Sequence, residues 1–309
     1  MSPSQSLAEV TSRMMAAIPR VFENFQPHFA VVQGDTTTTL CGGLSAFYRR
    51  VPVGHVEAGL RTGDFGAPFP EEMNRSLVGR IATLHFAATA TASGNLLAEG
   101  IPADRIHITG NTGIDALRYI CDRLDRGILK PRVVLPRSEK RRIVVTIHRR
   151  EALHHGLAAI CQALVTLAED PLLEIVLPLH PNPAVQEAVL TSLADGKAIR
   201  VVDPMDYASF VALMRSADLV LTDSGGIQEE APHLGIPVLV LREKTERPEG
   251  VTAGLARMVG YRSESILAGC HEVLAIGHCD APKKSSHAIY GDGQASERIR
   301  DLIHSFLGK

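Results

Sequence analysis

The chain has 309 residues, a length that ordinarily forms two domains. It is 45% hydrophobic and 21% charged, which is the composition of a globular protein with packed cores. The formal charge is −2, and aromatic residues make up 5% with no Trp, so we expect neither a nucleic-acid surface nor a stacking platform for bases.

The first half of the chain alternates short apolar runs with amphipathic stretches, which predicts strands that are followed by helices. The helix over 72–81 is expected to bury an apolar face with Met73, Leu77 and Ile81. The predicted strands are 29–32, 51–56, 84–87 and 105–108, the predicted helices are 38–48 and 72–81, and residues 122–140 are interpreted as a linker.

The second half repeats this alternation, with a break near 281–286 before a final helix over 294–307. The predicted strands are 142–147, 173–177, 199–202, 219–221 and 238–241, with helices over 153–167, near 183–193 and between the later strands. Continuous apolar strands are typical of parallel sheets with both faces covered, so the fold class is α/β with two Rossmann-like lobes. Ligands of such sheets bind at the carboxyl ends of the strands, where polar residues carry the most information.

The five cysteines are widely spaced and include no C-x-x-C pair, which argues against disulfides and a cysteine metal site. The first residues lack the pattern of a signal peptide, and no apolar run approaches the roughly 20 residues of a membrane span. We therefore expect a cytoplasmic protein without a metal and without a membrane or nucleic-acid partner.

Acidic residues follow three successive elements of the first half. Asp35 comes after the first strand in G-D-T-T-T-T, where it is a helix cap or a functional acid. Glu57 follows the next strand in H-V-E-A-G-L-R-T; its H-x-E lacks the downstream P-C-x-x-C of a zinc deaminase, and a solvated Glu is the alternative. Glu71 and Glu72 open a helix, where one carboxylate is explained by its favourable interaction with the positive end of the helix dipole. Arg75 lies one turn later. Converging acids would suit proton transfer.

In the second half, His148 and Arg149 follow a strand in H-R-R-E. His148 could donate to a phosphate or transfer a proton, and Arg149 could bind a phosphate with two N–H groups. The alternative is a surface charge cluster. His180 ends the next strand, where packing against the loop is the alternative.

The run D-S-G-G-I-Q-E-E from Asp223 to Glu230 is the most specific segment. Its small residues Ser224, Gly225 and Gly226 would let a phosphate approach a helix N-terminus, and Glu230 could accept from two ribose hydroxyls. Arg247 in T-E-R-P-E is a further phosphate candidate, and a plain glycine-rich turn is the alternative for the segment. There is no G-x-G-x-x-G or G-x-x-x-x-G-K-[ST], so no dinucleotide cofactor or triphosphatase site is expected.

In this order, these motifs resemble those of the non-hydrolysing UDP-N-acetylglucosamine 2-epimerases, and the resemblance extends over essentially the whole chain, to Y-G-D-G-Q at residues 290–294. It implies two lobes of the GT-B type with the active site in the cleft between them. The first lobe would comprise residues 1–111 with a returning helix at 292–309, and the UDP-binding lobe residues 112–291. The family begins with a strand and a G-T-R-P-E loop, so the resemblance implies that the first lobe here lacks about two βα units.

The implied reaction interconverts UDP-N-acetylglucosamine (UDP-GlcNAc) and UDP-N-acetylmannosamine (UDP-ManNAc), for cell-envelope polysaccharide precursors. UDP leaves C1 as the C2 proton is removed, and UDP returns after C2 is reprotonated on the other face. Two alternatives remain open: a hydrolysing relative that releases UDP and free ManNAc, and a non-catalytic nucleotide-sugar binding protein inactivated by the short first lobe.

The resemblance also implies roles for individual residues. Phe210 matches the position that packs near uracil, while Met205 replaces a Gln that relatives commonly carry. A homodimer and an allosteric UDP-GlcNAc are implied as well, and no cofactor is. The residues implied to be catalytic are Asp35, Glu57, Glu71 and His148, and those implied to bind substrate are Arg75, Arg149, His180, Phe210, Ser224, Gly225, Gly226, Glu230 and Arg247.

Overall fold

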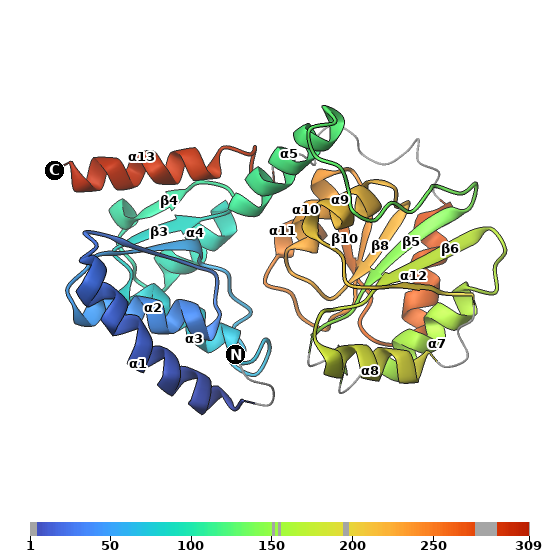
Figure 1. The fold of residues 1–309 in the computed structure, drawn as a ribbon, viewed down its shortest axis with the longest axis horizontal. Coiled ribbons are helices and arrows are strands. Elements are labelled where there is room, and N and C mark those ends of the chain that lie inside the picture. The colour runs from blue at the N-terminus through green and yellow to red at the C-terminus, as the bar shows by residue number, and fades with distance from the viewer. Residues whose placement is uncertain (1–4, 150–151, 154–155, 194–197, 276–288, 309) are drawn as a thin grey trace. The chain divides into compact units, whose positions relative to one another are not determined.

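The computed structural model describes residues 5–149, 152–153, 156–193, 198–275 and 289–308. The chain divides into two compact units, each described by itself (Figure 1): unit 1, Met1–Asp115 with Tyr290–Lys309, and unit 2, Ala116–Ile289. The break predicted near 281–286 lies outside the described residues. No helix of the described part is long and apolar enough to cross a membrane.

Unit 1 is built on a parallel sheet with the strand order β1-β2-β3-β4, as the apolar runs predict. Its strands are β1 (Ala30–Gln33), β2 (Val53–Ala58), β3 (Leu84–Ala87) and β4 (Ile106–Ile108). Its helices are α1 (Leu7–Phe25), α2 (Thr37–Tyr48), α3 (Glu71–Ile81), α4 (Ala90–Ala98), η1 (Ala103–Arg105), α13 (Ala295–Leu307) and the start of α5 (Thr112–Asp125).

Two apolar clusters cover this sheet. The returning helix α13 contributes Ile299, which packs with Val56 and Phe86 of the sheet, and Phe306, whose ring meets that of Phe29 edge-on at 5.5 Å. A second cluster joins Phe22 of α1 and Ala46 of α2 to Ala30, Val32 and Val53 of the strands. The last helix of the sequence therefore completes the core of the unit that holds the first residues (Figure 1).

One predicted core face of unit 1 is wrong. Met73 and Leu77 of α3 are 40% and 46% exposed, whereas Glu72, Asn74 and Arg75 are buried. The helix turns its polar side inward because buried partners for those polar groups lie there, as the contacts of Arg75 below show. Periodicity identified the helix but not the face that is covered.

Unit 2 has a parallel sheet with the strand order β10-β9-β8-β5-β6-β7. Its strands are β5 (Arg141–Thr146), β6 (Leu173–Pro178), β7 (Arg200–Val202), β8 (Leu219–Thr222), β9 (Val238–Val240) and β10 (Ala256–Met258). Its helices, besides the end of α5, are α7 (Leu157–Leu167), α8 (Pro183–Ser192), α9 (Tyr207–Arg215), α10 (Ile227–His233), α11 (Pro248–Thr252) and α12 (Ser263–Ala275).

Alternate residues of β5 enter opposite cores of unit 2. Ile143 and Val145 pack with α7, α8 and α12, whereas Val144 packs with α9, α10 and Leu117 of α5. Helices therefore cover both faces of the sheet, which confirms the predicted α/β class. In the sheet, Thr146 at the end of β5 pairs with Thr222 at the end of β8, so the residues that follow these strands meet at one edge.

The predicted linker is helical at its start, because α5 runs to Asp125. Residues 126–140 form no helix or strand. The fully buried Arg142 donates to the carbonyl oxygens of Leu135 and Pro136, which fastens the end of this segment to β5.

Candidate functional site

Asp35 stands in the turn between β1 and α2. The helix is capped by its neighbour Thr36, whose hydroxyl accepts the backbone N–H of Thr39 at 3.4 Å. The alternative in which Asp35 caps the helix is therefore wrong. The Asp35 carboxylate instead pairs with the guanidinium of Arg75, and Asn74 donates its side-chain amide to the Asp35 carbonyl oxygen at 2.9 Å.

Arg75 holds two carboxylates in unit 1. Its side chain is 2% exposed, and besides Asp35 it lies 3.3 Å from Oε2 of the buried Glu72. The other oxygen of Glu72 accepts the backbone N–H groups of Thr62 and Gly63, each at 3.0 Å. Of the two acids that open α3, Glu72 is thus a buried structural partner. The predicted catalytic residue Glu71 is half-buried on the first turn, and among the described residues no hydrogen bond or ion pair joins it to Asp35.

Glu57 lies near the end of β2 in a strained backbone conformation. Its φ is +61°, in the left-handed region that non-glycine residues rarely occupy, at an irregularity in the pairing with β3. Asn111 donates its side-chain amide to Glu57 Oε1 at 3.3 Å. A Cβ on Gly34 would come 3.3 Å from Glu57 Oε2, so the Glu57 carboxylate sits against the turn that carries Asp35.

A buried histidine supports the same turn. The Nε2 atom of His55 lies 2.8 Å from the Gly34 carbonyl oxygen. Burial lowers the pKa of His55 to about 4, so the ring is neutral at neutral pH and donates from Nε2 to that carbonyl. His55 belongs to the H-V-E motif, but its side chain binds the backbone carbonyl of Gly34 and so supports the turn that carries Asp35.

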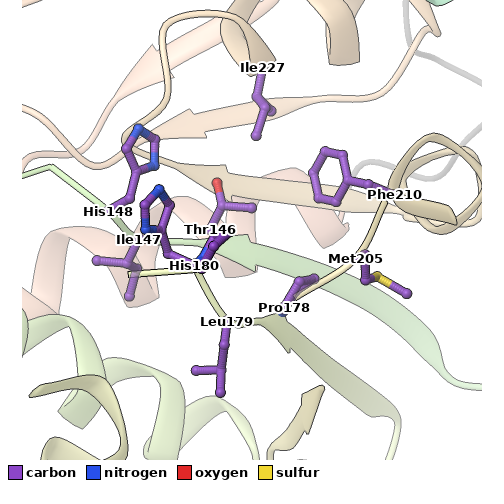
Figure 2. A pocket seen from close by; sticks show the side chains of 10 residues that line it. Thr146, Ile147, His148, Pro178, Leu179, His180, Met205, Phe210 and Ile227 are labelled. Carbon is purple, nitrogen blue, oxygen red and sulfur yellow. The ribbon is translucent and has the colours of Figure 1, made fainter. Parts of the chain in front are cut away.

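Unit 2 contains a cavity of about 180 Å³ at the carboxyl ends of β5 and β6 (Figure 2). The predicted catalytic residue His148 meets the predicted substrate residues His180 and Phe210 there, and the described lining does not include Ser224, Gly225, Gly226, Glu230 or Arg247. The lining residues are Thr146, Ile147, His148, Pro178, Leu179, His180, Pro181, Met205, Phe210 and Ile227.

His148 is tied to the fully buried Asp223 that follows β8. Its Nδ1 atom lies 3.0 Å from Asp223 Oδ1, and the backbone N–H groups of His148 and Arg149 both donate to Asp223 Oδ2 at 2.8 Å. These contacts hold the pKa of Asp223 below its ordinary value despite its burial. The imidazole of His180 stacks on that of His148 with 5.5 Å between ring centres, as the two rings in Figure 2 show.

The Ser224–Gly226 turn leads into α10. The Ser224 N–H donates to the Thr222 hydroxyl at 2.9 Å, and α10 begins at Ile227. Arg247 lies directly against Gly225, where a Cβ would come 2.5 Å from a guanidinium nitrogen. Arg247 is 6% exposed and is ion-paired with Glu229 and Glu246, so it packs beneath the turn.

Glu230 of α10 accepts a hydrogen bond from the hydroxyl of Tyr207 at 3.0 Å. Burial raises the pKa of Glu230 to about 7, although the Tyr207 hydrogen bond opposes the rise. The carboxyl predicted to hold ribose hydroxyls therefore titrates near neutral pH.

Sequence reasoning gave no role to Asp223, which it named only as the start of the D-S-G-G run, or to Asn111 and Tyr207. Asp223 follows β8, and Asn111 comes soon after β4. The same rule that selected Asp35 and His148, a polar residue after a strand, would have found both. Tyr207 lies on a helix and carries no such signal. The described residues include no group of three or more His, Cys, Asp or Glu side chains arranged to hold a metal ion.

Comparison with known proteins places these observations in a family. The sequence profile of the family described as UDP-N-acetylglucosamine 2-epimerase matches residues 1–304. The UDP-N-acetylglucosamine 2-epimerase of Salmonella typhimurium is 46% identical, over 99% of this chain and 83% of that protein.

Two solved structures agree over nearly the whole chain. The UDP-GlcNAc 2-epimerase of Neisseria meningitidis, determined with UDP-GlcNAc, has a TM-score of 0.92 at 38% identity and covers 99% of this chain and 84% of its own. An S. aureus protein determined with UDP has a TM-score of 0.88 at 40% identity, covering 100% and 82%. The two-lobed parallel α/β fold of the GT-B type is thereby confirmed, and the chain belongs to the UDP-N-acetylglucosamine 2-epimerase family.

Proposed function

We propose that this chain interconverts UDP-GlcNAc and UDP-ManNAc by inverting C2 of the sugar. The observation that carries the proposal is the family match over residues 1–304. The arrangement of unit 1, with Asp35 and Glu57 on neighbouring strand ends, supports it because the reaction needs groups that exchange protons.

The C2 hydrogen of the sugar is not acidic, so inversion without redox chemistry requires elimination. A carboxylate removes the C2 proton while the electron pair of the C1–O bond leaves with the phosphate oxygen, which yields UDP and 2-acetamidoglucal. A carboxylic acid then protonates C2 from the opposite face, and the phosphate oxygen bonds again to C1. Asp35, Glu57 and Glu71 are the proposed groups, and Asp35 is ion-paired with Arg75.

The proposed nucleotide contacts lie in unit 2. Phe210 packs near uracil, Glu230 accepts from the ribose hydroxyls, and Ser224, Gly225 and Gly226 face the phosphates. His148 acts on the leaving phosphate, with Arg149, His180 and Arg247 as neighbouring substrate groups. The cavity that joins Phe210, His148 and His180 supports this assignment.

The resemblance further supports a homodimer and a second, regulatory UDP-GlcNAc, and the cysteine spacing supports a cytoplasmic protein. Light scattering of the purified chain measures its mass in solution. A sigmoidal rate against UDP-GlcNAc concentration would be the sign of the regulatory molecule.

The test is incubation with UDP-GlcNAc in deuterium oxide. We expect UDP-ManNAc to form and deuterium to enter at C2 of both sugars. Free UDP released in step with ManNAc would identify a hydrolysing enzyme. UDP binding by the folded chain, with neither product nor deuterium exchange, would make it a non-catalytic nucleotide-sugar binding protein and contradict the proposal.

A further inference from the structure

We propose that Asp223 is a positioning residue that holds His148 with a proton on Nδ1 and with Nε2 available to a phosphate oxygen. The inference deepens the proposed function, because it rests on UDP being the leaving group held at this cavity. Asp223 itself is fully buried and does not line the cavity.

The contacts of Asp223 leave it one consistent ionisation state. Oδ2 accepts two backbone N–H groups, from His148 and Arg149, and Oδ1 faces His148 Nδ1 at 3.0 Å. Oδ2 is therefore an acceptor, and the contacts with His148 and Arg149 hold the pKa of Asp223 below its ordinary value despite its burial, so the group is a carboxylate. A carboxylate at 3.0 Å requires a donor on His148, which places a proton on Nδ1. The opposite ring nitrogen, Nε2, is then the one that is free to gain or lose a proton.

His180, which stacks on the His148 ring, has the opposite tautomer. Its Nδ1 atom accepts the backbone N–H of Asn182 at 3.2 Å, which leaves no proton there and assigns the ring proton to Nε2. Burial and the charge of His148 both lower the pKa of His180. His180 is therefore favoured in its neutral form beside His148.

This arrangement suits an oxygen that gains negative charge during the reaction. A protonated His148 donates from Nε2 to the phosphate oxygen as the C1–O bond breaks, and the neutral His180 supplies a second N–H donor without repelling the first ring. Among the described residues, Asp223 and His180 are titratable groups in contact with the His148 ring, and Arg149 follows it in the chain.

The decisive variant is Asp223→Asn. The amide oxygen can still accept the two backbone N–H groups, but the amide nitrogen then faces His148 Nδ1 and requires an acceptor there, so the ring proton moves to Nε2. We expect nitrogen-15 correlation spectra of the resting chain, taken where the ring is neutral, to show this exchange of tautomer. We expect kcat near neutral pH to fall at least about tenfold, with KM changed less than about threefold, and the pH profile of kcat to shift.

Asp218→Asn is the matched control. Asp218 stands at the other end of β8, is also buried, and also accepts a backbone N–H, from Arg142 at 2.7 Å. We expect this variant to lower the melting temperature without changing the His148 tautomer or the pH profile. If Asp223→Asn behaves in the same way, Asp223 is only a structural residue and the proposal is overturned.

The wild-type spectrum keeps the proposal testable if Asp223→Asn does not fold. A neutral His148 with its proton on Nε2 in the wild-type chain contradicts the proposal outright. The spectra need no substrate, so they also separate the two proposals. If the tautomer follows Asp223 in a chain without epimerase activity, the proposed function fails while the positioning of His148 stands.

Discussion

Arg75 and Asp35 form an ion pair that joins residues 40 positions apart in the chain. Arg75 lies on a buried turn of α3 and Asp35 in the turn after β1, and the same guanidinium neutralises Glu72. One cation therefore contacts two carboxylates inside unit 1.

Replacing Arg75 by Met is expected to destabilise the chain by about 3–5 kcal/mol, because it leaves the buried Glu72 and the partly buried Asp35 without a cation. Urea denaturation measures this loss. Arg80→Met on the same helix is the control; Arg80 is exposed and should cost less than about 1 kcal/mol. Adding Glu72→Gln to Arg75→Met should recover part of the loss, and no recovery would contradict the account.

Asp35→Asn and Glu57→Gln are each expected to abolish turnover while UDP affinity stays within about threefold, because their proposed work is proton transfer rather than phosphate binding. Deuterium exchange at C2 and calorimetry with UDP measure the two effects. Glu23→Gln removes an exposed carboxylate of α1 and should change neither. A variant at Asp35 or Glu57 with nearly full activity would remove that residue from the catalytic set.

Glu230 should make nucleoside binding depend on pH. Burial raises its pKa to about 7, so the carboxylate that is proposed to accept from the ribose hydroxyls is lost as the pH falls below that value. We expect uridine affinity to fall by about tenfold between pH 8 and pH 6. Uridine is the probe because it carries no phosphate that titrates in this range. Calorimetry on Glu230→Gln should show a uridine affinity that does not change between pH 8 and pH 6. A pH dependence that persists in this variant would come from another group.

The buried histidines of unit 1 should make the chain sensitive to acid. Burial lowers the pKa of both His55 and His85 to about 4, whereas an unfolded histidine has its ordinary value near 6.5. The unfolded chain therefore binds these protons first, and stability is lost as the pH falls from about 6.5 toward 4, at up to about 1.4 kcal/mol per pH unit for each residue.

His85→Phe should reduce this dependence on pH, as measured by urea denaturation between pH 7 and pH 4.5. His304→Phe, at an exposed position of α13, should leave it unchanged. Equal slopes in His85→Phe and the wild type would show that His85 does not carry the effect.

Two adjacent glycines should respond differently to Ala. At Gly225 a Cβ would come 2.5 Å from Arg247, whose guanidinium is held by Glu229 and Glu246, so we expect a loss of about 1–3 kcal/mol in the free energy of unfolding. At Gly226 a Cβ meets nothing within 4 Å, and the stability should stay within about 0.5 kcal/mol. Thermal unfolding of both variants measures the difference, and equal losses would contradict the packing described for Arg247.

Much of the fold follows from local pattern. The apolar runs of β5 and β8 predict buried parallel strands, because only a strand covered on both faces is apolar at every position. No helix was predicted over α1, whose Phe22 packs against the strands, and the pattern misassigns the covered face of α3. There, Met73 and Leu77 are exposed because Arg75 and Glu72 find buried partners, and such partners cannot be read from periodicity.

The sequence by itself determined the alternation of strands and helices, the family, and the presence of polar residues after the strands, because these depend on order along the chain. The tertiary structure alone decided which of those residues meet. It paired Asp35 with Arg75 and left the capping to Thr36, and it placed Asp223 against His148, 75 residues earlier in the chain. The physical reason is that burial makes each charged group take a partner, and the packing of the sheets determines which partner is within reach.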